Sequence, residues 1–440
     1  MGRRQHYLIG KQLRKKYISD SPGFLSDKYN PNEVYVRATD INRTIESAQS
    51  QLLGLYPPGD EQLNLMNNQT QIAVPLFQVS SDIENDVTKN LGQNSIPFNQ
   101  RFVPVHVYEM PLDKFQPSDY CQYINQEKSR RETSKELQDL LQRDHADLIQ
   151  ELAPKLGITD LQSFTSLNAV DSVDSIYARY FNQTPITGFE EQAFMDQMMD
   201  LLDQQFSYIL TGNETALKLF VTGVLSEVVG QFRKQIQIDQ DPSLKNKERL
   251  KLFFYSDHDD SIAALVKTFQ YSLGKYPSYA SQILFELRKQ AQSQDYFVNL
   301  IINDVKVKIP NNCESKDSCN FDKFVEYIKS VSYYTKYQEY FQLCGIQVQI
   351  KMNEKLNIKP HSLHSFSSRY IQLNEFDFKQ VELAMKVVAS YIAILAASLI
   401  VWALINRKKS QKQAIQYNIQ NDIVESDTPH SKNSIDIQIS

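Results

Sequence analysis

Several features that mark large classes of enzymes are scarce in this sequence or missing from it. Glycine occurs only 13 times among 440 residues, and neither a GxGxxG nor a GxxxxGK[ST] motif is present. A loop of backbone amides that holds phosphate is therefore not expected, and an anion site must be built from side chains. The four cysteines form no CxxC pair, which argues against a structural zinc site. We expect neither a metal nor another cofactor.

Charge and composition exclude further classes of protein. The formal net charge is -5 at pH 7, so the chain lacks the basic excess of a nucleic-acid-binding protein, and we expect no such partner. Hydrophobic residues make up 41% and charged residues 22%, which excludes a disordered chain and a polytopic membrane protein. The length is sufficient for one or two sizeable hydrophobic cores.

One long run without charge, VVASYIAILAASLIVWALI, occupies residues 387–405. As a helix it would be about 28 Å long, close to the roughly 30 Å of a bilayer core. Lys and Arg cluster after it at 407–412, against Lys386 before it, so the positive-inside rule places 406–440 in the cytoplasm. We therefore predict a single-pass type I membrane protein, lysosomal, in another endomembrane or at the cell surface. A buried core helix is the alternative.

The first residues, MGRRQHYLIGKQLRKKYI, contain no apolar stretch of the kind found in a signal peptide. Tyr7, Leu8, Leu13 and Tyr17 instead recur at helical spacing between Lys and Arg, which predicts an amphipathic surface helix. A large domain outside the cytoplasm needs a signal peptide. Either the predicted position of the domain outside the cytoplasm is wrong, or the sequence begins too late to include a signal peptide.

Two other features favour a position outside the cytoplasm. N-x-[ST] sequons, which are candidate glycosylation sites, begin at Asn42, Asn68, Asn182 and Asn213. The cysteines precede the apolar run and are Cys121, Cys313, Cys319 and Cys344. Their even number permits two disulfides in three connectivities, and four buried thiols are the alternative.

Short apolar strands alternate with helices along the chain. Strands are predicted at 33–37, 103–108, 252–256, 282–287 and 296–302, from their β-branched and aromatic residues. Amphipathic helices are predicted at 41–55 and 261–269. Residues from about 126 to 240 show helical patterns and no clear strand. We therefore expect an α/β fold, in which a central mixed sheet is flanked by helices and carries a mostly helical insertion.

Charged residues lie at or just beyond the carboxyl ends of two of the predicted strands. Arg37 ends the strand EVYVR, and the sequence DHDD at 257–260 follows LFFYS. Ligands of open α/β sheets bind beyond the carboxyl ends of strands, where Arg37 could hold an oxyanion in a bidentate manner. The alternative is an ion pair with Asp40 or another carboxylate. His258 could bind an anion and Asp259 could act as a general acid, unless they are a surface histidine and a helix N-cap.

Several segments resemble the histidine acid phosphatases, the group of the phosphoglycerate-mutase-like superfamily that includes prostatic and lysosomal acid phosphatases. The segments are VYVRATDINRTIESAQSQLLGLYPP, PVHVYEMPLDKF, LFFYSDHDDSIAALVKTF and the first residues GRRQHYLIGKQLRKKY. The similarity covers about residues 1–345. We expect a stalk at 346–386 between this domain and the predicted membrane span.

The resemblance implies hydrolysis of a phosphomonoester through a phosphohistidine intermediate. Arg37 and His258 fall at positions where the family binds the phosphoryl oxygens, and Asp259 falls at the position of its proton donor. The partners expected are this substrate and the lipid bilayer, and a homodimer is left open.

The resemblance also implies disulfides between Cys121 and Cys344 and between Cys313 and Cys319. Models of loop entropy value the first at roughly 5 kcal/mol and the second at roughly 2 kcal/mol.

The family's RHGxRxP motif, which carries the nucleophilic histidine, does not occur in the sequence. The segment Arg4-Gln5-His6 lacks its glycine and second arginine, and we expect His6 to be an exposed helical residue. Deleting a nucleophile lowers a rate on the order of 10⁶-fold. We therefore expect a membrane-anchored acid phosphatase whose nucleophile-bearing segment is missing from this chain, which as given is inactive. A pseudoenzyme or binding ectodomain is the first alternative, and a phytase or inositol-polyphosphate phosphatase is the second.

Overall fold

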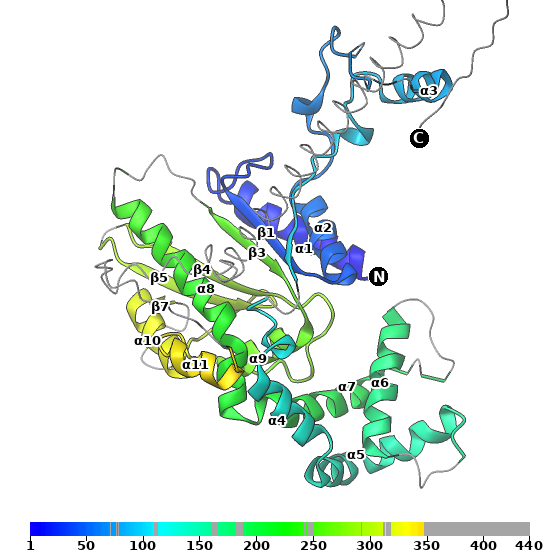
Figure 1. Ribbon diagram of the computed structural model, residues 1–440, viewed down its shortest axis with the longest axis vertical. Coiled ribbons are helices and arrows are strands. Elements are labelled where there is room, and N and C mark those ends of the chain that lie inside the picture. Colours follow the sequence, from blue (N-terminus) through cyan, green and yellow to red (C-terminus); the bar gives the residue numbers. More distant parts are fainter. Residues whose placement is uncertain are drawn as a thin grey trace, which may run out of the picture. The chain divides into compact units, whose positions relative to one another are not determined.

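A computed structural model describes most of residues 1–346 (Figure 1). Within that span it does not describe residues 71, 76, 78, 110–112, 160–164, 182–187, 190, 242, 244–249, 292, 311–312 and 314–317. The predicted membrane span at 387–405, the tail at 406–440 and nearly all of the predicted stalk lie outside the described residues, as does Asn182.

Three parallel strands form the first sheet, in the order β2-β1-β3. They are β1 (Val34–Thr39), β2 (His106–Tyr108) and β3 (Leu252–Ser256). Arg37 of β1 lies opposite Tyr255 of β3, so the two strands end at the same edge of the sheet. The residues that follow Arg37 and Tyr255 are therefore neighbours in space.

The remaining strands form a separate antiparallel sheet. It contains β4 (Ile283–Lys289), β5 (Tyr296–Ile302), β6 (Val305–Val307) and β7 (Cys319–Asn320). In the described part of the chain, β3 and β4 are not hydrogen-bonded to each other, so two sheets replace the single mixed sheet that we expected. Apolar patterns indicate where strands lie, but hydrogen bonding between strands depends on tertiary packing.

Two helices near the N-terminus cross very closely. They are α1 (Gly2–Arg14), continued by a π-helical turn at Lys15–Ser19, and α2 (Asn42–Leu55). Gly10 and Gly54 lie at the crossing, where a Cβ on either residue would overlap the backbone of the opposite helix. The amphipathic helix predicted at the start of the chain is therefore confirmed. Leu13 and Tyr17 are buried in a core, and Tyr7 and Leu8 remain exposed.

A helical region lies between β2 and β3. The helix α3 (Ser81–Leu91) precedes β2, and a 3-10 turn at Pro117–Asp119 follows it. The helical region then comprises α4 (Gln122–Glu132), α5 (Lys135–Lys155), α6 (Ser166–Phe181), α7 (Gln192–Phe206), a π-helical turn at Ser207–Thr211 and α8 (Glu214–Gln240). The figure shows α5, α6 and α7 grouped beyond α4. Their apolar faces form a core of their own. The described residues of this region contain no strand after β2, as expected.

Within the described residues, α8 is long and apolar enough to cross a membrane by length and composition alone. Its side chains Leu219, Phe220 and Leu225 are buried in the main hydrophobic core. The helix contacts α9 (Asp259–Thr268) and α10 (Phe321–Val331). These contacts are those of a core helix of the domain.

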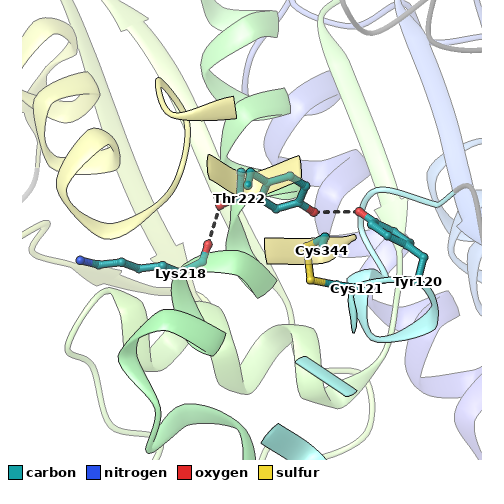
Figure 2. Close-up of a disulfide and its surroundings, with 6 residues drawn as sticks. Tyr120, Cys121, Lys218, Thr222 and Cys344 are labelled. Atoms are coloured by element: carbon teal, nitrogen blue, oxygen red, sulfur yellow. Dashed lines mark hydrogen bonds between the residues drawn. A yellow bond between two sulfur atoms is a disulfide. The ribbon is translucent and has the colours of Figure 1, made fainter. Parts of the chain in front are cut away.

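Both pairs of cysteines are joined as the resemblance implies, Cys121 with Cys344 and Cys313 with Cys319. The first bond ties the N-cap residue of α4 to the end of α11 (Tyr337–Cys344) (Figure 2). Beside it, the hydroxyl oxygens of Tyr120 and Tyr340 lie 2.8 Å apart. The bond therefore holds segments that are 223 positions apart in sequence against the same core.

Candidate active site

Arg37 lies near the carboxyl end of β1 and is only 4% exposed. Its Nη2 forms an ion pair with Asp113. The same carboxylate accepts hydrogen bonds from the backbone amide of Phe115 (2.9 Å) and the hydroxyl of Tyr255 (3.1 Å). Arg37 is thus in an ion pair, as one alternative foresaw, but its partner is Asp113 rather than Asp40.

Aromatic rings surround the Arg37 guanidinium. Its Cζ lies 4.0 Å from the ring centroid of Tyr108, 4.4 Å from that of Phe115 and 5.4 Å from that of Tyr255. Such rings stabilise a buried cation. The Nε of Arg37 is buried and has no hydrogen-bond partner among the described residues. An unsatisfied buried donor costs about 1–3 kcal/mol, which an oxyanion placed there would recover.

His258 is the N-cap residue of α9 and lies against the end of β1. Its Nε2 is 3.1 Å from Oγ1 of Thr39, and its Nδ1 is 3.3 Å from Nη2 of Arg43. Because a guanidinium can only donate, Nδ1 accepts from Arg43, and Nε2 therefore carries the proton and donates to Thr39. Burial lowers the pKa of His258, and the positive charge of Arg43 lowers it further, against the opposing effect of Asp259.

Two threonines support the histidine. The Oγ1 atoms of Thr39 and Thr44 are 2.7 Å apart, and the Thr44 hydroxyl donates to the backbone carbonyls of Thr39 (2.9 Å) and Ile41 (2.8 Å). The sequence analysis singled out neither these threonines nor Asp113. A sequence signal existed for Thr39, because it lies close after the predicted strand at 33–37, but only the fold brings it to His258.

Three carboxylates surround the start of α9. Asp259 is the first helical residue and is exposed, so it is not the N-cap that one alternative proposed. Burial and the nearby carboxylates of Asp259 and Asp260 raise the pKa of Tyr276. Burial and the neighbouring Asp260 raise the pKa of Asp257, which also accepts a hydrogen bond from Gln116. Burial and the charge of Asp259 raise the pKa of Asp260 to about 6.

The three predicted site residues therefore lie at the same edge of the parallel sheet. Arg37 reaches it from β1, and His258 and Asp259 reach it from the junction of β3 and α9. His6 is helical as expected but half-buried, so the expectation of an exposed side chain was wrong. Its Nδ1 is 3.1 Å from Oε1 of Gln51, because α1 packs closely on α2.

The described sequon asparagines differ in their surroundings. Asn42 and Asn68 are exposed. Asn213 is the N-cap of α8, where its Oδ1 accepts from the amide of Ala216 (3.0 Å) and its Nδ2 donates to Glu127 (2.8 Å). These contacts favour a structural role for Asn213, and glycosylation of the other two stays a prediction.

Curated relatives of the chain are acid phosphatases. Human lysosomal acid phosphatase is 27% identical over 310 residues, which cover 70% of this chain and 63% of that protein. The Xenopus laevis lysosomal acid phosphatase is also 27% identical, and the matched region covers 62% of it. Human prostatic acid phosphatase is 24% identical over 342 residues, or 75% of each chain. The chain thus spans less than two thirds of the lysosomal enzymes.

Solved structures and a family model agree with this relationship. The apo form of Hafnia alvei phytase has a TM-score of 0.53 at 14% identity, over 76% of this chain and 87% of that one, which shows a shared fold. The model of the histidine phosphatase superfamily (branch 2) matches residues 1–303, well over half of the chain. With its fold, its relatives and its family model in agreement, the chain belongs to branch 2 of the histidine phosphatase superfamily.

Proposed function

We propose that this protein is a membrane-anchored acid phosphatase that hydrolyses phosphomonoesters. The observation that carries the proposal is that Arg37, His258 and Asp259 lie at the same edge of the parallel sheet. Arg37 offers a buried Nε without a partner among the described residues, which suits a phosphoryl oxygen. An anion beside His258 would favour its protonated form, which donates hydrogen bonds from both ring nitrogens.

The proposed reaction has two steps. A histidine nitrogen attacks phosphorus, the bond from phosphorus to the leaving oxygen breaks, and Asp259 gives its proton to that oxygen. Water then attacks the phosphohistidine, releases inorganic phosphate and returns a proton to Asp259. Arg37 and His258 stabilise the charge on the transferring group in both steps.

The RHGxRxP motif does not occur in the sequence, so the nucleophile of the proposed reaction would lie on a strand that this chain does not contain. Two features support a place for that strand between β3 and β4. Among the described residues, β3 pairs with β1 and β4 pairs with β5, which leaves one edge of each without a partner. Leu252 and Phe254 of β3 pack against the same hydrophobic core as Leu284 of β4. Backbone amides and carbonyls at these unpaired strand edges require hydrogen-bond partners where they are buried.

A complementation assay tests the proposal. The chain alone should bind inorganic phosphate but release no p-nitrophenol from p-nitrophenyl phosphate at pH 5. Addition of a synthetic strand peptide with the RHGxRxP motif should restore release, and a matched peptide with alanine in place of its histidine should not. Turnover by the chain alone would place the nucleophile within the printed residues and overturn this part of the proposal. Failure to bind phosphate would overturn the assigned roles of Arg37 and His258.

The absent motif also favours a second candidate, a pseudoenzyme that binds phosphate groups. It predicts phosphate binding without turnover in the presence of either peptide. The same assay therefore separates the two candidates.

The membrane anchor is part of the proposal and rests on the apolar run at 387–405 with the basic cluster after it. The disulfides suit an oxidising compartment such as the lumen or the cell surface. We expect the protein to resist extraction by alkaline carbonate. An epitope tag at the C-terminus should be digested by a protease added from the cytoplasmic side. Release by carbonate would refute the anchor.

A further inference from the structure

The chain between α2 and β2 contains a segment, residues 59–102, that joins no hydrophobic core. Among its described residues, no hydrophobic side chain is buried. Apolar side chains that are exposed singly are ordinary, but a concentration of them marks a surface that binds a partner. We call residues 59–102 the α3 segment, after its helix. Its large apolar side chains that are more than half exposed, at 57–79%, are Met66, Ile72, Phe77, Ile83, Phe98 and Phe102.

Hydrogen bonds between the outgoing and returning chains give the base of the α3 segment a defined shape. The backbone amide of Gly59 donates to the carbonyl oxygen of Phe98 (2.8 Å). The amide of Asp60 donates to the carbonyl oxygen of Asn99 (3.2 Å). The carboxylate of Asp60 is buried, and its Oδ2 accepts a hydrogen bond from Nε of Arg101 (2.6 Å). The exposed apolar side chains are therefore attached to an ordered base.

This base holds an aromatic ring in solvent through an unfavourable backbone conformation. Phe98 and Asn99 have φ angles of 59° and 46°, in the left-handed region that bulky residues rarely adopt. Nδ2 of Asn99 donates to Oδ1 of Asn94 (2.9 Å), which helps to fix the turn. The conformation of Phe98 and the exposure of its ring both oppose folding in water, and strain of this kind is typical of functional sites.

The charge of the α3 segment argues against a second copy of this chain as the partner. The segment contains five carboxylates and two basic side chains, a net charge of -3, and three of the carboxylates, Asp82, Glu84 and Asp86, belong to α3. A two-fold dimer brings the same surface of both copies together, so these carboxylates would face each other. They also disfavour an anionic leaflet. A zwitterionic bilayer has no net charge to repel them and accepts apolar side chains at its interface.

The predicted membrane anchor brings a bilayer within reach of this surface. The described part of the domain ends at residue 346, and the predicted span begins at residue 387. The 40 residues between them would extend at most about 140 Å. A tethered surface meets the bilayer at a high effective concentration, so a few apolar side chains are sufficient for contact.

We propose that the α3 segment docks on the non-cytoplasmic leaflet of the bilayer that anchors the chain, with Ile83, Phe98 and Phe102 entering the lipid interface. The inference rests on the membrane anchor of the proposed function and is independent of the phosphatase chemistry. It gives the folded domain a contact with lipid of its own, in addition to the predicted span.

Tryptophan fluorescence of the full chain in phosphatidylcholine vesicles, with and without bromine on the acyl chains, tests the inference. The only tryptophan of the sequence, Trp402, lies in the predicted span, so quenching of its emission by bromine reports the anchor. Combining Trp402→Phe with Phe98→Trp gives a single reporter on the α3 segment. Brominated lipid should lower the emission of this reporter about twofold, because a docked ring reaches the acyl boundary. Adding Phe102→Ser should reduce that quenching by about half through loss of apolar contact.

Matched variants control for exposure and for loss of an apolar side chain elsewhere. Phe24 is an exposed aromatic residue outside the α3 segment, and Leu8 is an exposed apolar residue of α1. With Trp402→Phe, a Phe24→Trp reporter should not be quenched by bromine. Leu8→Ser, in place of Phe102→Ser, should leave the quenching of the Phe98→Trp reporter unchanged.

The two tryptophan positions distinguish the possible failures. Absence of quenching at Trp402 in the original chain would overturn the anchor, and the inference with it. If Trp402 is quenched, a Phe98→Trp reporter that bromine quenches no more than the Phe24→Trp reporter overturns the inference alone. A Phe98→Trp reporter that is shielded from iodide in solution but not quenched by bromine would show that protein, such as a second copy, covers the surface, and would also overturn the inference.

Discussion

Arg37 and Asp113 form an ion pair that is almost completely removed from solvent, with side chains 5% and 1% exposed. Asp113 occupies part of the hydrogen-bonding capacity of the arginine that the proposed mechanism assigns to phosphate. The aromatic rings around Arg37 and the amide of Phe115 hold the pair in place. The carboxylate thus neutralises the arginine in this structure and also competes with any anion that approaches.

The first prediction concerns this pair. Asp113→Asn should lower the free energy of unfolding by about 3 kcal/mol, because it leaves the Arg37 charge buried without a counterion. Inorganic phosphate should restore part of this loss, so the rise in Tm with phosphate should be larger for the variant than for the original chain. Thermal unfolding with and without phosphate measures both effects. An equal rise in the two proteins would show that phosphate does not bind at Arg37.

The second prediction concerns the pH dependence of stability near α9. The pKa of Asp260 is about 6 in the folded state, against an ordinary value of 3.8. Because the folded state holds this proton more tightly, stability is greatest below the ordinary pKa and is lost as the pH rises through about 6. Asp260→Asn retains an acceptor for the amide of Ser261 and removes the charge. It should therefore stabilise the protein by about 2–3 kcal/mol at pH 7.5 and have little effect at pH 3.5.

Thermal unfolding of both proteins at the two pH values checks the Asp260 prediction. The same stabilisation at pH 3.5 and pH 7.5 would contradict it, since the effect would then not come from the charge.

The third prediction concerns the crossing of α1 and α2. A Cβ at Gly10 would lie 1.9 Å from the carbonyl oxygen of Gln51, which belongs to the backbone of α2. Gly10→Ala should therefore lower the free energy of unfolding by about 3 kcal/mol, because the helices must move apart. Gly230→Ala is the matched control, since no described atom beyond its chain neighbours and the nearby backbone of its own helix lies within 4 Å of its added Cβ. The control should stabilise α8 by about 0.5–1 kcal/mol.

Urea denaturation of the two glycine variants compares them directly. Equal stability of Gly10→Ala and Gly230→Ala would contradict the close approach of α1 and α2.

The fourth prediction compares the disulfides. Replacing Cys121 and Cys344 together by alanine should lower the free energy of unfolding by about 5 kcal/mol, and replacing Cys313 and Cys319 by about 2 kcal/mol. The difference arises because the first bond closes a loop of 223 positions and the second a loop of 6. Denaturant titration gives both values, and a larger loss for the short loop would contradict the loop-entropy explanation.

Local patterns predicted many elements well. The strands expected at 252–256 and 296–302 have those bounds in the structure, and the helix expected at 41–55 begins one residue later. In each case, the spacing of apolar residues along the segment matches the period of a single strand or helix. The helix α6 lies within the stretch from about 126 to 240 that was expected to be mostly helical.

The sequence by itself determined the family, the positions of Arg37, His258 and Asp259 at the ends of two strands, and the cysteine pairs through the resemblance. These follow from short motifs and from apolar periodicity, which are local properties of the chain. Only the tertiary structure decided that Asp113 holds Arg37, that Thr39 and Arg43 contact His258, and that the described strands form two sheets where one was expected. Such contacts join residues tens to hundreds of positions apart, and their partners are chosen by packing and burial of the whole domain.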